Sequence, residues 1–365
     1  MIIMNSKKIL HVVPDSVAVQ NNIYLGSTKD IRGRTEYFLA RAIPFEELLV
    51  KSRSDQYLLE KLKAIDLEQY YAIIFDLALY PKAMKYVRTS FPNIKLIARS
   101  HNAYFYHWLH YFWASHKNST NRYSKKTLEN NSQYLRLAIE RLKLDIICAR
   151  LSDYMLTIVD WEKENYWKFL ISTKKIRTLP YFLPKAYEIE VAETPKKNQC
   201  VCLMSTGTGT VLPLLQDALL NFNKLVEKLE ANNPEWNFFV TGDLSRQINA
   251  YPDRVKLTGF LESPLPLLME SRAMALLSDY GFGFKTKLLD AIQSGCYILI
   301  PKKLYNRLPV ECKPFCIVVD LNSVQSFKDA LEYSKTPFPS GDLNAQFKER
   351  AFSILDELLM TGQNM

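Results

Sequence analysis

The sequence has few of the residues that mark several classes of protein. Its 365 residues include 11 glycines and 17 prolines, which is too few for a collagen-like or low-complexity chain. No apolar run reaches the roughly 18 residues that a membrane-spanning helix needs. The first residues, MIIMNSKKILHVVP, run directly into an apolar segment and lack the pattern of a signal peptide. We therefore expect a globular, cytoplasmic protein.

Cysteine is also scarce. The six cysteines lie at positions 148, 200, 202, 296, 312 and 316, most of them within apolar runs. This placement predicts buried, unbridged thiols in a reducing compartment. Cys312 and Cys316 have a spacing that metal ligands can have, but no second pair of cysteine or histidine residues stands near them. We expect no metal and no cofactor.

The positive charge belongs to one half of the chain. Of the net charge of +9, residues 1–200 carry a balance of +11 and residues 201–365 a balance of −2. A basic half is typical of proteins that bind nucleic acid, an anionic membrane or an anionic substrate. A merely soluble basic surface has the same composition. Because no nucleic-acid-binding module is recognisable, we expect no nucleic acid partner.

Short apolar segments alternate with helical patterns along the whole chain. Strands are predicted at residues 8–13, 71–75, 94–98, 154–158, 176–183, 200–204, 236–240, 255–258, 273–277, 297–300 and 315–319. The alternation predicts an α/β protein with parallel, doubly wound sheets. A polar segment with prolines near both ends, residues 185–198, divides the pattern. We therefore expect domains at residues 1–184 and 199–343, joined by this linker, with a last helix in residues 344–365.

One stretch, SDYGFGFKTKLLDAIQSG at residues 278–295, organises the second domain. It lies between two predicted strands and contains Gly281, Gly283, Lys285 and Lys287 before an apolar helical face. Glycines let the backbone approach a ligand, and N–H groups at a helix start together with lysine charges bind anions. The alternative is a plain strand–loop–helix connection with solvated lysines.

A second glycine loop follows the strand at residues 200–204. Its sequence is STGTGT, residues 205–210, and a helix is predicted after it. Hydroxyl groups and glycines before a helix again suit an anion. It is not a Walker loop, because no Gly-Lys-Ser/Thr follows.

These features resemble GT-B glycosyltransferases, in particular the retaining family numbered four. Many members read G-x-G-x-K-x-K-x-L-E-A-M-x-x-G in the organising stretch. The matching residues here are Gly281, Gly283, Lys285, Lys287, Leu289, Asp290, Ala291, Ile292 and Gly295. Asp290 stands where the family has glutamate, and Phe282 removes the first member of the family's Glu-x7-Glu pair. The order of strand-Gly-Asp, Val-x-x-x-Gly-Phe and this loop extends the resemblance over residues 200–300.

The resemblance implies a GT-B fold, in which two doubly wound Rossmann-like domains face a cleft and the terminal helix crosses back to the first domain. It implies a nucleotide-sugar donor and transfer, without a metal, to a polysaccharide or lipid-linked oligosaccharide in bacterial surface-glycan synthesis. The donor-binding residues it indicates are Ser205, Thr206, Gly207, Thr208, Gly209, Gly242, Arg246, Gly281, Phe282, Gly283, Phe284, Lys285, Thr286 and Lys287. Members often hold the diphosphate with an arginine and a lysine near the first loop, where this chain has neither before Lys224.

The candidate catalytic residues are His101 and Asp290. His101 follows the strand at residues 94–98, where ligands of parallel sheets bind, and family members have a histidine on such a loop. The alternative is a loop that caps the next helix, through Asn102 especially. Acceptor-side candidates are Gly33, Arg34, Asn102 and Trp108. We expect Arg34 to begin a helix after a polar loop, with solvation of its charge as the alternative to substrate binding.

Residues 103–115 are unusually aromatic, and a basic polar segment follows them. Such a pair suits the headgroup layer of an anionic membrane, which would place the protein at the inner face of the cell membrane. It also suits a sugar acceptor, or an ordinary aromatic core helix. Two other functions remain open: a GT-B-shaped nucleotide-sugar epimerase, and a non-catalytic transferase-like partner subunit.

Overall fold

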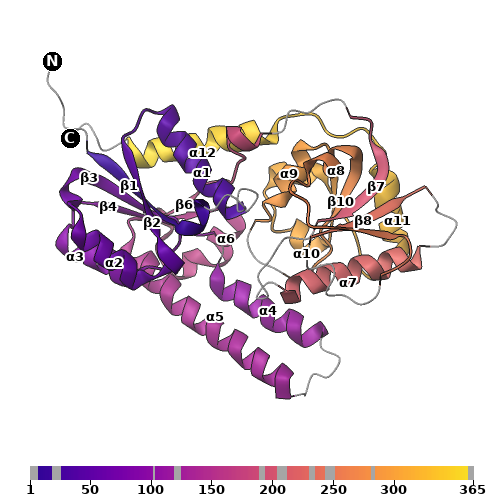
Figure 1. Cartoon of the computed structure of the whole chain (residues 1–365), viewed down its shortest axis with the longest axis horizontal. Helices are drawn as coiled ribbons and strands as arrows, with labels where there is room; N and C mark the ends of the chain where they lie inside the picture. The colour runs from indigo at the N-terminus through magenta and orange to yellow at the C-terminus, as the bar shows by residue number, and fades with distance from the viewer. Residues whose placement is uncertain are drawn as a thin grey trace. The chain divides into compact units, whose positions relative to one another are not determined.

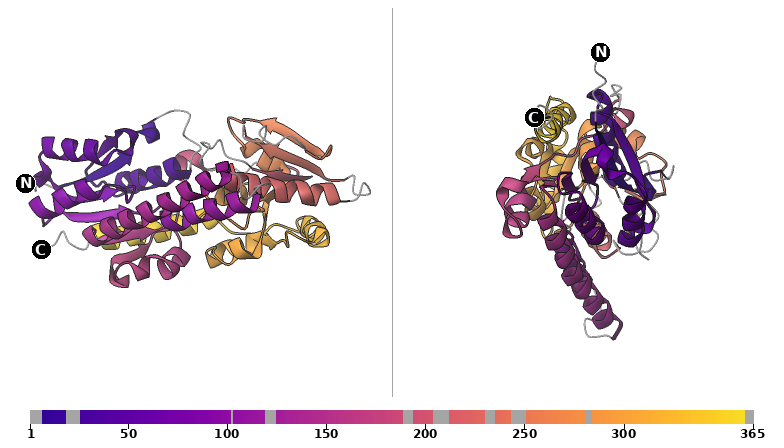
Figure 2. Two further views of the ribbon diagram at one scale, coloured as in Figure 1. Left: turned by 90° about the horizontal axis from the view of Figure 1, so that it is seen from below. Right: turned by 90° about the vertical axis from the view of Figure 1, so that its left-hand side faces the viewer.

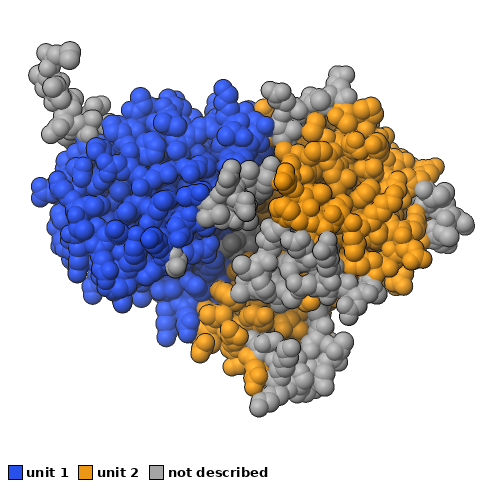
Figure 3. Space-filling model, in the orientation of Figure 1, with its two compact units in different colours: residues 1–105, 138–188, 345–365 blue, residues 106–137, 189–344 orange. Residues whose placement is uncertain are grey.

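The computed structural model describes residues 7–18, 26–101, 103–118, 125–188, 194–203, 212–229, 235–242, 251–280 and 284–360. The chain forms two compact units (Figure 3). Unit 1 comprises residues 1–105, 138–188 and 345–365, and unit 2 comprises residues 106–137 and 189–344. Each unit contains one six-stranded parallel sheet, so the predicted α/β class with doubly wound sheets is confirmed.

The sheet of unit 1 has the strand order β2-β1-β3-β4-β5-β6 (Figure 1). Its strands are β1 (Lys8–Pro14), β2 (Phe45–Val50), β3 (Tyr70–Phe75), β4 (Lys95–Arg99), β5 (Tyr154–Thr157) and β6 (Ile176–Thr178). All neighbours pair in parallel. The central strands are mainly apolar because helices cover both faces of a parallel sheet, and His11 of β1 and Arg99 of β4 are buried exceptions.

The helices of the first half of the chain are α1 (Gly26–Ala40), α2 (Asp55–Ala64), α3 (Pro81–Ser90), α4 (Tyr104–Asn118), α5 (Lys125–Leu151) and α6 (Asp160–Asn165). The terminal helix α12 (Leu343–Leu359) ends the second half. Right-handed crossovers place α1 on one face and α2 with α3 on the other, and α2 packs against α3. α12 lies beside α1, where Asp356 accepts hydrogen bonds from Tyr37 and Arg41 at 2.8–2.9 Å. α4 and α5 run side by side (Figures 1 and 2), and the rings of Trp108 and Tyr134 stack 6.1 Å apart.

The sheet of unit 2 has the order β12-β11-β10-β7-β8-β9. Its strands are β7 (Lys197–Cys202), β8 (Asn237–Thr241), β9 (Val255–Gly259), β10 (Ser271–Ala275), β11 (Tyr297–Ile300) and β12 (Cys316–Val318). The helices are α7 (Leu212–Lys228), α8 (Leu265–Glu270), α9 (Lys287–Gln293), α10 (Lys302–Tyr305) and α11 (Val324–Tyr333). α7 and α11 cover one face, where Phe222, Phe238 and Phe327 meet at ring distances of 6.0–6.5 Å.

Short 3-10 helices connect these elements at Asp15–Ala18, Lys51–Arg53, Leu67–Gln69, Trp167–Phe169, Thr173–Lys175, Lys185–Tyr187 and Val310–Phe315. None of the six cysteines forms a disulfide, and all but Cys316 are buried, as their apolar surroundings predicted. Within the described ranges, no helix is both long and apolar enough to cross a membrane.

Within the first fifty residues one expectation is wrong and one strand was missed. The polar segment before Arg34 is not a loop, because α1 already begins at Gly26. The helix extends there because its inner face is polar and buried, and Asp30 pairs with Arg34 one turn later at 2.9 Å. β2, which no apolar pattern indicated, is an edge strand whose glutamates pair with Lys8 and Arg32.

Candidate functional site

The strand order of unit 2 reverses between β7 and β10. From β7 the chain continues through β8 and β9 on one side, and from β10 it continues through β11 and β12 on the other. Open parallel sheets bind ligands beyond the carboxyl ends of the strands at such a reversal. The predicted lysines lie there, because Lys285 and Lys287 come shortly after β10.

The two lysines have different roles at this place. Lys287 donates from Nζ to the main-chain carbonyl oxygen of Leu203, directly after β7, and so ties the ends of β7 and β10 together. Lys285 is partly buried and has no carboxylate partner among the described residues. Burial, Lys287 and Arg307 together lower the pKa of Lys285 to about 8. Lys285 is therefore a cation whose charge nothing in the described structure neutralises.

The start of α9 contributes less than the sequence suggested. The N–H groups of Leu288 and Leu289 already donate to the carbonyl oxygens of Lys285 and Thr286, at 2.8 and 3.1 Å. Because these N–H groups are already bonded, the described residues can bind an anion through the lysine charges and not through the start of this short helix. Asp290 is 8% exposed on α9. Burial lowers the pKa of Lys287 below its ordinary value, and Asp290 acts in the opposite direction. Phe284 is buried.

A buried acid, which the sequence analysis missed, lies near these residues. Asp217 of α7 is 1% exposed and accepts hydrogen bonds from Ser278 Oγ at 2.7 Å and Lys117 Nζ at 3.0 Å. It thereby fixes the segment that leaves β10. The only signal in the sequence was an acid within the apolar pattern of α7, and nothing there indicated its partners.

The aromatic segment of α4 contributes to unit 2. The rings of Trp108 and Tyr111 pack against Tyr134 of α5, and Tyr280 packs against the same cluster. Burial, Lys285 and His110 lower the pKa of His107 to about 3, so His107 is neutral at pH 7. Neutral His107 beside Lys285 leaves the ammonium group as the main charge at this place.

His101 lies at the carboxyl end of β4, as predicted, and is 8% exposed. Its Nε2 atom is 3.6 Å from Asp30 Oδ2 and 3.7 Å from Asp76 Oδ1. Asp30 comes from α1 and Asp76 follows β3. Two acids from distant parts of the sequence therefore face the candidate catalytic ring, and they favour an imidazole N–H directed toward them.

Two arginines complete a buried ionic network around these acids. Arg34 pairs with Asp30 at 2.9 Å and also with Asp76, while Arg99 binds both oxygens of Asp30 at 2.7 and 3.0 Å. Although burial opposes the charged form, Arg34 and Arg99 hold the pKa of Asp30 below its usual range. Arg34 is 2% exposed. The alternative of a solvated Arg34 is therefore wrong, and two acids already balance its charge.

His11 and Glu47 extend the network to the edge of the sheet. His11 Nε2 bonds Asp76, and its Nδ1 atom is 3.8 Å from Glu47. Burial opposes the charge on His11, but Asp76 and Glu47 raise its pKa above the ordinary value. The acids and bases of the cluster thus balance one another.

This balance bears on metal binding. Asp30, Asp76 and His101 form a group of metal-ligand types whose atoms lie within 4.8 Å of one another. A divalent cation would have to displace two arginines from the carboxylates, and it would add charge to a network that is already neutralised. The donor set fits an internal ion network rather than a metal centre.

The remaining predicted residues divide into two sets. Gly33 lies within α1, where an added Cβ would come 3.0 Å from the ring of Phe182, so its small size serves packing. Gly242 ends β8 with a φ of 89° and donates to Gly259 O at 2.7 Å, which explains the need for glycine. The others lie outside the described residues: Asn102, Ser205, Thr206, Gly207, Thr208, Gly209, Arg246, Gly281, Phe282 and Gly283.

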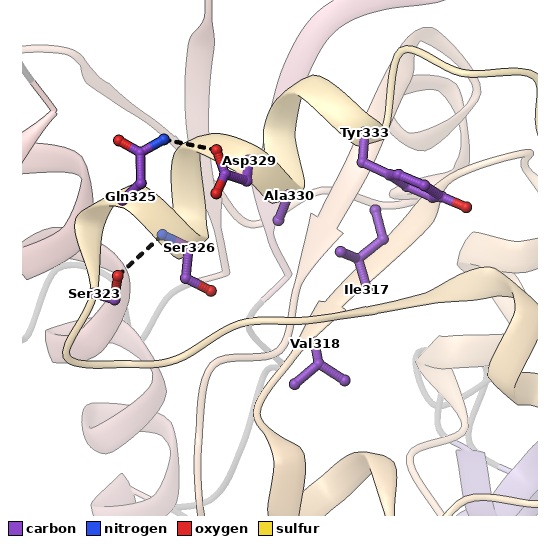
Figure 4. A pocket seen from close by; sticks show the side chains of 8 residues that line it. All are labelled: Ile317, Val318, Ser323, Gln325, Ser326, Asp329, Ala330 and Tyr333. Carbon is purple, nitrogen blue, oxygen red and sulfur yellow. Dashed lines mark hydrogen bonds between the residues drawn. The ribbon is translucent and has the colours of Figure 1, made fainter.

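A shallow groove of about 400 Å³ between β12 and α11 is separate from these residues (Figure 4). It is lined by Ile317, Val318, Ser323, Gln325, Ser326, Asp329, Ala330 and Tyr333. Its polar groups bond to each other along α11, as in the 2.6 Å contact from Gln325 to Asp329. None of the candidate residues reaches it, so it is not part of the candidate site.

Known proteins resemble this chain in structure. No family model matches the sequence, and no curated protein matches it. Sucrose-phosphate synthase from Thermosynechococcus elongatus superimposes with a TM-score of 0.60 at 13% identity, over 98% of each chain. Anabaena HepE in complex with UDP and glucose gives 0.58 at 11% identity, over 98% of this chain and 100% of that one. The apo form of the lipopolysaccharide outer core galactosyltransferase WaaB gives 0.55 at 11%, over 97% and 99%.

These three structures share the α/β architecture of the GT-B class across almost their whole length. The chain therefore has the GT-B fold, with two six-stranded parallel sheets and flanking helices. At 11–13% identity the likeness establishes the fold and leaves the chemistry to the residues described above.

Proposed function

We propose that the chain is a glycosyltransferase that moves a sugar from a nucleotide-sugar donor to a glycan acceptor. The observation that carries the proposal is Lys285, an unneutralised cation at the strand reversal of unit 2 in a GT-B fold. The solved structure of Anabaena HepE contains UDP and glucose. A bound nucleoside diphosphate would bring the negative charge that balances the ammonium group of Lys285.

The chemistry follows from where charge develops. Breaking the bond between the sugar and the phosphate leaves negative charge on the departing diphosphate. Fixed cations and main-chain N–H groups stabilise that charge in the transition state. In this proposal Lys285 and the glycine loops at residues 205–209 and 281–283 contact the diphosphate without a metal. Lys287 and Asp290 hold the loop against β7.

The acceptor side of the proposal rests on the first half of the chain. His101 contacts a sugar hydroxyl, and its Nε2 atom lies 3.6 and 3.7 Å from the carboxylates of Asp30 and Asp76. The excess of positive charge in residues 1–200 suits an acidic or lipid-linked glycan at an anionic membrane surface. WaaB, a lipopolysaccharide galactosyltransferase, shares the fold. We propose a role in bacterial surface-glycan synthesis and a place at the inner face of the membrane.

Calorimetric titration with UDP, GDP, ADP and dTDP tests the donor site. One nucleotide should bind, and Lys285→Ala should weaken it by roughly 1.5–3 kcal/mol, the range for hydrogen bonds to charged groups. Lys302→Ala is the control, because this lysine is exposed on the neighbouring α10. Unchanged affinity in Lys285→Ala would refute the role of Lys285.

The same preparation separates the two other functions. An epimerase converts a nucleotide-sugar in the absence of any acceptor, whereas a transferase needs the acceptor for turnover. A non-catalytic partner subunit binds no nucleotide in the titration. Turnover of a UDP-sugar that depends on an added glycan acceptor is the result we expect.

A further inference from the structure

Arg307 lies in the segment that follows β11, beyond the carboxyl ends of the neighbouring strands β10 and β11. β10 and β11 pair in parallel up to Ala275 and Leu299, so the segments that follow them leave the same edge of the sheet side by side. The first segment leads to Lys285, and the second leads through α10 to Arg307. An ion pair of 3.2 Å between Asp279 and Lys303 joins the two segments.

The position of Arg307 is fixed by local structure. Its N–H group donates to Leu304 O at 3.0 Å, and Leu304 is itself buried. The arginine side chain is partly buried. The hydrogen bond places the main chain, and partial burial of the side chain removes some of its conformational entropy before any ligand arrives, which favours binding.

Two lysines and Arg307 lie near one another at this edge of the sheet. Its guanidinium lies close enough to Lys285 to disfavour the charged lysine, and Lys287 acts on Lys285 in the same direction. Asp279, the acid that acts on Arg307, is shared with Lys303. Keeping like charges together costs stability, and proteins retain such an arrangement mainly where an anion binds.

The segment directly after β7 has no lysine or arginine of its own. The sequence contains no lysine or arginine from residue 203 to residue 223. Among the described residues, Arg307 in the segment after β11 is a cation that can supply a second contact to a diphosphate.

We propose that Arg307 binds the diphosphate of the nucleotide donor together with Lys285. This inference rests on the proposed function and names a binding residue that the sequence pattern did not indicate. Guanidinium has the fork geometry that binds two phosphate oxygens at once. It also stays charged above pH 8, where Lys285 loses its proton. Arg307 therefore maintains the positive charge of the site over a wider pH range than the lysine does.

Titration of the full chain with UDP, the other three nucleoside diphosphates and inorganic pyrophosphate tests this inference. Arg307→Ala should weaken the nucleotide that binds the wild type by about tenfold or more, and pyrophosphate with it. Arg307→Lys should recover part of the affinity. Lys302→Ala, a charge deletion in the same segment, should have no effect. Thermal unfolding of each variant checks that it is folded.

The outcomes distinguish the role of Arg307 from the proposed function as a whole. Wild-type affinity in both Arg307 variants, together with weak binding in Lys285→Ala, would overturn the role of Arg307 and leave the donor site standing. A wild-type chain that binds none of the four nucleotides and no pyrophosphate would overturn the proposed function and this inference together. If Arg307→Ala does not fold, undiminished binding by Arg307→Lys and an Arg307→Gln variant overturns the inference.

Discussion

At the scale of single residues, the most informative feature is the charge state of Lys285. Its pKa of about 8 in the ligand-free protein means that a bound anion, which favours the ammonium form, raises the pKa. Binding therefore takes up a proton when the pH lies near or above 8. Binding at a site that must first lose a proton would instead release one.

We therefore expect the affinity for a nucleoside diphosphate to fall by about tenfold between pH 7 and pH 9, because about a tenth of Lys285 remains protonated at pH 9. Calorimetry in buffers of different ionisation enthalpy measures the proton uptake directly. Lys285→Arg should bind with a flat profile over this range. A wild-type profile as flat as that of the variant would contradict the assignment.

A second residue with a shifted charge state is Glu162 in unit 1. It is fully buried, and neither of its carboxyl oxygens has a hydrogen-bond partner in the part of the chain that the structure describes. Burial raises its pKa to about 8 against the opposing effect of Arg99. Folded protein thus holds a proton that the unfolded chain releases near pH 4. Between about pH 4 and pH 8 this group makes the protein less stable as the pH rises.

Replacement of Glu162 by glutamine keeps the shape of the side chain and removes its ionisable proton. We expect Glu162→Gln to be more stable than the wild type at pH 8, by about 4 kcal/mol, and equal to it near pH 4. Asp145, whose pKa burial raises to about 7, keeps part of the slope. Urea unfolding at several pH values measures this, with the exposed Glu164→Gln as control. Parallel curves for the two variants would rule the explanation out.

At the scale of elements, α12 is held on unit 1 by contacts far apart in sequence. Phe352 packs edge-on against Tyr37 at 5.2 Å, Arg41 pairs with Asp356 at 2.8 Å, and Leu355 is fully buried. The helix therefore belongs to the core of unit 1.

Truncation of Leu355 should show this energetically. Leu355→Ala should cost about 2–5 kcal/mol of unfolding free energy, as for other fully buried leucines. Ser353→Ala, on the exposed side of the same helix, should cost almost nothing. The urea midpoints of the two variants give the comparison, and equal midpoints would mean that α12 does not stabilise the fold.

The helices and strands also show how much of the fold could be predicted from the sequence alone. The central strands were predictable, because strands buried on both faces need unbroken apolar runs. β2 was not, since its stability comes from pairing with β1 and from ion pairs with Lys8 and Arg32. The start of α1 was not predictable either, because Asp30 lies in a segment that was expected to be a polar loop, and its partner Arg99 is far away in the sequence. The place of His101 after β4 followed from the strand pattern, whereas Arg307 carried no local signal.

At the scale of the whole molecule, the basic half of the chain and an exposed apolar stripe occur together. Leu135, Ile139 and Ile147 of α5 are each between 43% and 48% exposed, and Lys143 and Arg150 are exposed along the same helix. Apolar side chains flanked by cations suit an anionic bilayer surface.

We expect the protein to float with liposomes that contain anionic lipids at low salt, and to be released by about 0.5 M salt because of screening. Ile139→Glu with Ile147→Glu should abolish flotation, whereas Glu164→Gln should not. Absence of flotation in low salt would remove the membrane proposal and leave the donor site untouched.

The central claim is that cations at the β7–β10 reversal bind a departing diphosphate. A crystal structure of the protein with a bound nucleoside diphosphate tests this most directly. We expect the phosphates within hydrogen-bond distance of Lys285 Nζ and beside Arg307. A diphosphate bound elsewhere, with Lys285 still facing no anion, would contradict the claim.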